Sequence, residues 1–237
     1  MMKPLAHTVL PEEVVSRIRE EILTGRLRQG QKLSETELAQ ALSVSRAPVR
    51  EGLIRLAGEG LVTLTPHRGA AVVQLSPQDT RELATLRAAL EELAWAAACA
   101  RLDDAGHREL TAIVEEMREN VSAKEHERLV RLDIDFHDKV FKIASHDRLY
   151  AAWTTIKSQA ALYLLTRRAV SEDYHEIVVN EHEELLTILA AGEPGRAVSA
   201  INRHIAGGYL RLLATYEAPE EVPEKFATIT QPDRERV

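Results

Sequence analysis

Proline and glycine, the residues that interrupt helices, are scarce over most of the chain. No proline lies between Pro77 and Pro194, and the only glycine between Pro77 and Gly192 is Gly106. Such a stretch, rich in Ala, Leu, Glu and Arg, is typical of consecutive helices. We expect these helices near residues 77–102, 105–122, 125–145, 147–168, 172–191 and 194–216.

Cysteine and long apolar segments are equally scarce. Cys99 is the only cysteine, which excludes an internal disulfide and a cluster of thiolate ligands. Its small-residue surroundings favour a buried structural thiol. No apolar run approaches the roughly 18 residues that a membrane-spanning helix needs, and the N-terminus has no signal-peptide pattern. We therefore expect a cytoplasmic protein that has no membrane partner.

The acidic charge belongs to one part of the chain. The net charge of the 237 residues is -7, but residues 1–75 hold ten Lys/Arg and eight Asp/Glu, which leaves a small positive excess. Glycine, proline and serine are also frequent before Leu75, and a chain of this length is commonly divided into two domains. We expect a domain over residues 1–75, an all-helical domain over 76–216 and a polar tail over 217–237.

The order of elements in residues 1–75 indicates a winged helix-turn-helix. Pro11 opens a helix with one apolar face, Ser34 begins a capping-box sequence, and Ser45 is a good N-cap for a third helix. The β-prone runs Leu61–Thr65 and Ala70–Leu75 then predict a hairpin with a basic tip. The expected fold is therefore mainly α, with a winged helix-turn-helix followed by an all-α bundle of about six helices.

The first turn of the third helix should present side chains suited to DNA. Ser45, Arg46, Ala47 and Arg50 lie there. An arginine can bridge two acceptors on guanine or hold a phosphate, and the free amides of a helix start suit a phosphate oxygen. Arg68, at the hairpin tip, could reach the minor groove or the DNA backbone. The alternative is that these arginines only solvate a surface.

These segments resemble the GntR family of bacterial regulators. The resemblance rests on residues 32–39 (KLSETELA), 44–51 (VSRAPVRE) and 53–62 (LIRLAGEGLV), and on Arg68-Gly69-Ala70. It implies a homodimer that binds a short palindromic operator in double-stranded DNA. Thr36 stands where some members place a DNA-contacting arginine, and it offers only a shorter phosphate hydrogen bond. The other operator contacts that the resemblance implies are Ser45, Arg46, Ala47, Pro48, Arg50, His67, Arg68 and Gly69.

Four residues of the helical region form a possible metal-binding set. Asp133 and His137 share one face of a helix predicted over Arg128–Ile143, and burying them unpaired would cost several kcal/mol. A hydrogen bond between the two within the helix is the simple explanation. The alternative is a metal site, because His182 and His204 are also flanked by apolar residues on later helices. One carboxylate and three imidazoles suit zinc, nickel, cobalt, manganese or iron.

The same region resembles the FCD ligand-binding domain of the FadR-type GntR regulators. The matching segments are residues 132–137 (LDIDFH), 144–149 (ASHDRL), 181–186 (EHEELL) and 203–205 (RHI). The resemblance spans about residues 78–216 and departs at Asp147, where members commonly have asparagine. It implies that Asp133, His137, His182 and His204 hold one divalent metal ion.

A small carboxylate effector can coordinate such an ion. Arg87 stands where the subgroup often has an arginine, and it could pair with a second carboxylate or a hydroxyl of that effector. The alternative for Arg87 is an i,i+4 salt bridge with Glu91, either at the surface or between helices.

Three functions are compatible with these features. We predict an effector-controlled transcriptional regulator, a repressor, whose operator affinity shifts by the differential binding energy of the effector. A metal-dependent enzyme could use the same Asp/His site, but no glutamate base is recognisable beside the ligands and the operator-reading domain would be unexplained. The third possibility is a constitutive DNA-binding protein whose helical part only dimerises and whose metal is structural.

Overall fold

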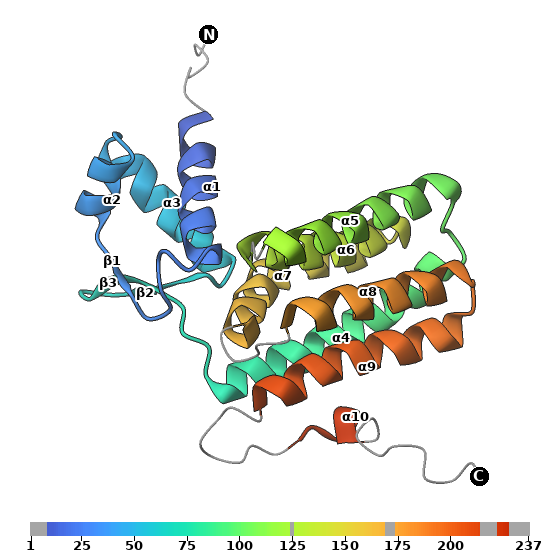
Figure 1. Ribbon diagram of the computed structural model, residues 1–237. Helices are drawn as coiled ribbons and strands as arrows, with labels where there is room; N and C mark the ends of the chain where they lie inside the picture. Colours follow the sequence, from blue (N-terminus) through green and yellow to red (C-terminus); the bar gives the residue numbers. More distant parts are fainter. Residues whose placement is uncertain (1–8, 124–125, 169–173, 214–221, 228–237) are drawn as a thin grey trace. The chain divides into compact units, whose positions relative to one another are not determined.

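The computed structural model describes residues 9–123, 126–168, 174–213 and 222–227 (Figure 1). Contacts along the backbone divide the chain into two compact units, Met1–Leu75 and Ser76–Val237. Among the described helices, none is both long and apolar enough to cross a membrane.

From residue 9 onward, where its structure is described, the first unit contains three helices, α1 (Val9–Leu23), α2 (Glu35–Ala41) and α3 (Arg46–Gly58). Ser34 caps α2, because its hydroxyl oxygen accepts a hydrogen bond from the Glu37 amide. The apolar face of α1 packs on α3. At their crossing, a Cβ atom added to Gly52 would lie 3.3 Å from a Val14 methyl group, so glycine permits the close approach of the two helices.

A three-stranded antiparallel sheet completes this unit. β2 (Val62–Thr65) and β3 (Gly69–Val72) form the wing hairpin, and β1 (Lys32–Leu33) pairs with the other edge of β3. The winged helix-turn-helix predicted from the sequence is therefore confirmed. β3 ends at Val72, earlier than the predicted Leu75, and β1 was not predicted, because two residues are too few to show a strand periodicity.

Within its described residues, the second unit is a bundle of six long helices followed by one short helix. The long helices are α4 (Pro77–Cys99), α5 (Asp104–Ala123), α6 (His126–Ile143), α7 (Asp147–Arg168), α8 (Tyr174–Ala190) and α9 (Pro194–Leu213). Ser76 and Asp79 form a capping box at the start of α4. As Figure 1 shows, α4 lies along α9 and α5 along α6. The mainly helical fold predicted from the sequence is confirmed.

Two expectations for this unit need correction. Cys99, the last residue of α4, is only partly buried, and this partial burial raises the pKa of its thiol. The predicted polar tail contains a short helix, α10 (Glu224–Ala227), in which Phe226 is buried against the ring of Tyr209. One aromatic residue in a polar segment produces no periodic pattern, so this contact could not be predicted from the sequence.

Candidate metal centre and DNA-contacting surface

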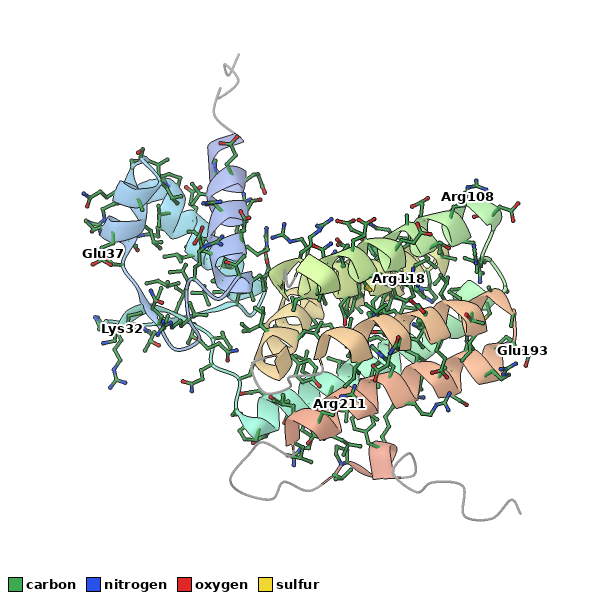
Figure 2. All side chains as sticks on the ribbon, in the orientation of Figure 1. Lys32, Glu37, Arg108, Arg118, Glu193 and Arg211 are labelled. Atoms are coloured by element: carbon green, nitrogen blue, oxygen red, sulfur yellow. The ribbon has the colours of Figure 1, made fainter. Side chains whose placement is uncertain are left out.

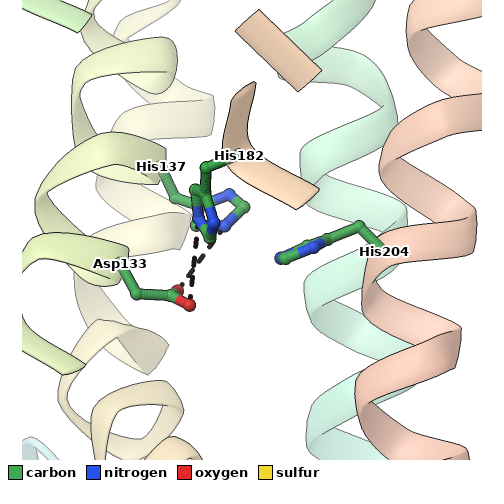
Figure 3. Close-up of side chains that lie close together, drawn as sticks. All are labelled: Asp133, His137, His182 and His204. Carbon is green, nitrogen blue, oxygen red and sulfur yellow. Dashed lines mark ion pairs between the residues drawn. The ribbon is translucent and has the colours of Figure 1, made fainter. Parts of the chain in front are cut away.

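Four side chains from three helices meet inside the second unit (Figure 3). Asp133 and His137 come from α6, His182 from α8 and His204 from α9. One possible ligand atom from each of them lies within 4.8 Å of the others. His204 is 6% exposed, and the other three side chains are fully inaccessible. The helical packing thus brings together residues that are far apart in the sequence.

The hydrogen bond considered between Asp133 and His137 is not formed. Nε2 of His137 lies 3.6 Å from Oδ1 of Asp133, which is too long for a hydrogen bond. Within the described part of the chain, both carboxylate oxygens of Asp133 and Nε2 of His137 and His182 are buried with no hydrogen-bond partner. Buried polar atoms are rarely left unpaired, because each costs about 1–3 kcal/mol. A cation bound among these atoms would satisfy them together.

The opposite nitrogen of each histidine ring faces an oxygen of the protein. Nδ1 of His137 lies 2.6 Å from Oε2 of Glu91, and Nδ1 of His182 lies 2.7 Å from the carbonyl oxygen of Val178. Nδ1 of His204 lies 2.8 Å from Oε2 of Glu181. For His137 and His182, acceptors placed in this way hold the proton on Nδ1 and leave Nε2 as the ligand atom, whereas Nδ1 of His204 has no hydrogen-bond partner in the described chain despite its short distance to Glu181.

No glutamate is recognisable beside the four residues in the sequence, but the structure places two there, Glu91 and Glu181. Glu91 is 46 residues away from its partner His137, and no sequence spacing connects them. Glu181 directly precedes His182, but it contacts His204 of another helix. Both contacts result from helix packing and have no local sequence signal.

Arg87 forms the i,i+4 salt bridge with Glu91 that was the alternative to effector binding, within α4 and in the interior of the unit. Its Nε donates to Oε1 of Glu91 at 2.6 Å, and its Nη2 lies 3.8 Å from Oδ1 of Asp133. The indole nitrogen of Trp95 also donates to Glu91. Arg87 is 3% exposed, so its guanidinium group is a buried cation between two carboxylates.

The charges of this cluster follow from its contacts. Burial opposes ionisation of Glu91, but His137 and Arg87 outweigh it and lower the pKa of that carboxyl group. Burial also opposes ionisation of Asp133, but His182 and other neighbours outweigh it and lower the pKa of that carboxyl group. Burial lowers the pKa values of His137 and His182. The two carboxylates share the single guanidinium group of Arg87, and a cation bound beside them would add a second positive charge.

On the first unit, the first turn of α3 presents the predicted DNA-contacting residues to solvent. The side chains of Arg46 and Arg50 are 60% and 61% exposed. Both are held by Glu35 at the start of α2, which accepts hydrogen bonds from Nε and Nη2 of Arg50 at 3.0 and 2.9 Å and from Nη2 of Arg46 at 3.1 Å. The sequence did not indicate this role for Glu35, because the pairing depends on how α2 packs on α3.

A cavity of about 550 Å³ lies between α2, α3 and the wing hairpin. Of the predicted DNA contacts, Thr36, Arg46, Arg50 and Gly69 line it. His67, with a positive φ of 61°, and Arg68 are exposed in the hairpin turn beside it. The remaining predicted contacts, Ser45, Ala47 and Pro48, lie at the start of α3.

A winged helix-turn-helix followed by an all-helical domain defines a DNA-binding transcriptional regulator. Residues 10–72 match the bacterial regulatory proteins of the gntR family, and residues 82–207 match the FCD domain. The chain therefore belongs to the GntR family, in the group whose second domain is an FCD domain.

Individual relatives agree with this assignment. The chain is 31% identical over 227 residues to a helix-turn-helix transcriptional regulator from Streptomyces ambofaciens, covering 91% of this chain and 89% of the relative. It is 27% identical over 174 residues to the gluconate operon transcriptional repressor of Bacillus licheniformis, covering 72% and 71%. The Escherichia coli structure McbR/YncC shares the fold, with a TM-score of 0.78, 20% identity and coverage of 89% and 100%. The chain is thus a transcriptional regulator and not an enzyme.

Proposed function

We propose that this regulator is a repressor whose operator affinity is controlled by a small organic acid bound at a divalent metal ion in the helical unit. The observation that carries the proposal is the group of buried, unpartnered ligand atoms on Asp133, His137 and His182. The name of one relative, the gluconate operon transcriptional repressor, adds support, because gluconate is itself a small carboxylate.

Asp133, His137, His182 and His204 would hold the ion, and their nitrogen and oxygen atoms suit zinc, nickel or another transition metal. When bound, such an ion offers an acidic centre to which a carboxylate oxygen can coordinate. Arg87 would pair with a second carboxylate or a hydroxyl of the acid, because its Nη2 has no hydrogen-bond partner in the described chain.

Two copies of the chain would bind a palindromic operator, as helix-turn-helix dimers generally do. The outer face of α4 supports a homodimer. Leu86 and Leu93 are 47% and 51% exposed there, and a spacing of two helical turns places them on one face. A second copy could cover this apolar surface, which is otherwise in contact with water.

The DNA contacts can be tested by substitution in α3. Arg46→Ala and Arg50→Ala are each expected to weaken operator binding by about 1–3 kcal/mol, because each removes a guanidinium group that bridges base or phosphate acceptors. The operator duplex would be obtained by selection from a random library and its binding measured by fluorescence anisotropy. Arg55→Ala makes the same charge change on α3 outside the cavity and should bind normally. Unchanged binding in both test variants would contradict the docking proposal.

The role of Glu91 can be tested through metal affinity. Glu91→Gln is expected to weaken zinc binding by about 10–100-fold, since the carboxylate orients the His137 ring and increases its basicity. Competition with a chelator of known affinity would measure the change. Glu82→Gln, on an exposed position of α4, is the matched control. Equal zinc affinity in the two variants would show that Glu91 does not position the ligand.

The complete proposal is tested by screening small carboxylates for a thermal shift with the zinc-loaded protein. An acid that raises the melting temperature should also change DNA retention in a gel, and this effect should disappear in His137→Ala. If a chelator lowers the melting temperature but no acid alters DNA binding, the metal is structural and the regulator is constitutive.

A further inference from the structure

We infer that divalent cations reach the buried cluster through a pocket between α8 and α9, which we call the cation port. The inference rests on the proposed metal centre and adds the route of the ion. The port has a volume of about 210 Å³, and its lining residues are Glu181, Glu184, Leu185, Ala200, Arg203 and His204.

His204 connects the port to the cluster. It is the one member of the four that retains some exposure, 6%, while Asp133, His137 and His182 have none. His204 both lines the port and offers a ligand atom to the cluster, so it is the member of the cluster that faces the port. Figure 3 shows its ring, on α9, facing the other three residues. An arriving ion would therefore meet His204 before it meets the other ligands.

Two glutamates line the port, Glu184 near its mouth and Glu181 beside His204. The side chain of Glu184 is 64% exposed, whereas that of Glu181 is 24% exposed and has its Oε2 at 2.8 Å from Nδ1 of His204. Oxygen atoms at these two depths offer a cation successive contacts, and they repel an anion. The two carboxylates therefore give a cation a path of oxygen ligands towards His204.

Two arginines compete with the ion for these carboxylates. Nη2 of Arg211, near the end of α9 (Figure 2), lies 2.8 Å from Oε1 of Glu181. Nη2 of Arg203 lies 3.5 Å from Oε1 of Glu184, and both side chains are at least 60% exposed. An exposed pair of this kind is weak and opens readily. Arg203 should therefore slow the capture of a cation by Glu184 without preventing it.

The port predicts that substitutions of Glu184 and Arg203 change the association rate constant of Zn²⁺ in opposite directions. The rate would be measured in a stopped-flow instrument, by mixing chelator-stripped full-length protein with Zn²⁺ and a fluorescent zinc indicator. Glu184→Gln should lower the association rate constant by about 3–10-fold at low ionic strength, because it removes an attracting charge. Arg203→Gln should raise it by a similar factor. The dissociation constant should stay within about twofold in both variants, since neither residue is a ligand, and near 1 M salt the differences should disappear.

Glu183→Gln is the matched control, with the same charge change on α8 at a residue outside the port. Its association rate constant should equal that of the unsubstituted protein. If the association rate constants of Glu184→Gln and Arg203→Gln are equal, or both change in the same direction, the port is refuted but the proposed metal centre is not. Failure of the unsubstituted protein to bind Zn²⁺ would instead overturn the metal centre and the port together.

Discussion

Replacing Arg87 by methionine is expected to lower the free energy of unfolding of the metal-free protein by about 3–5 kcal/mol. The guanidinium group is 3% exposed, and it lies 2.6 Å from Glu91 and 3.8 Å from Asp133. Without it, Glu91 and Asp133 would lose the guanidinium group that faces both of them, and Glu91 would keep only its contacts with Trp95 and His137. Methionine fills much of the same volume, so the loss would come from the uncompensated charge and not from a cavity.

Urea unfolding of the chelator-treated protein, followed by circular dichroism, would measure this loss. Binding of a divalent cation should reduce it, because the ion compensates the same carboxylates. Glu91→Gln combined with Arg87→Met should be more stable than Arg87→Met alone, since the double variant removes one of the stranded charges. Arg101→Met, at an exposed position, should change stability by no more than about 0.5 kcal/mol. A loss below about 1 kcal/mol in Arg87→Met would refute the buried-charge account.

Asp133→Asn is expected to separate metal binding from folding. The substitution preserves shape and removes the only carboxylate among the four proposed ligands, so zinc affinity should fall by at least about 100-fold. At a free zinc concentration of about 1000 times the original dissociation constant, about 2.7 kcal/mol of metal-dependent stabilisation should disappear. The metal-free variant should be no less stable, because Asp133 has two buried oxygens without hydrogen-bond partners in the described chain.

Thermal unfolding with and without zinc would show both effects. Asp135→Asn makes the same substitution at an exposed position of the same helix and should retain the full zinc-dependent shift. An undiminished shift in Asp133→Asn would show that Asp133 does not hold the ion. A large loss of stability in the absence of metal would show that the carboxylate has a structural role instead.

Local chemistry made much of the architecture predictable. The scarcity of proline and glycine after Pro77 indicated the six long helices, because these residues interrupt a helix wherever they occur. Capping residues such as Ser34 and Ser76 marked helix starts through contacts within one turn. Asp133 and His137 could be placed on one face, since a spacing of four residues is fixed by helix geometry.

Only the tertiary structure decided what those side chains meet. Helix packing brought His182 and His204 to Asp133, and it placed Glu91 against a histidine 46 residues away. It also set Glu35 between two arginines of α3 and buried Phe226 from the predicted tail. Periodicity shows which face of a helix is apolar, but not which residue of another helix lies opposite. The sequence by itself therefore determined the long helices, the wing hairpin and the family resemblance, whereas the packing determined the short elements β1 and α10 and the partners and access of the candidate site.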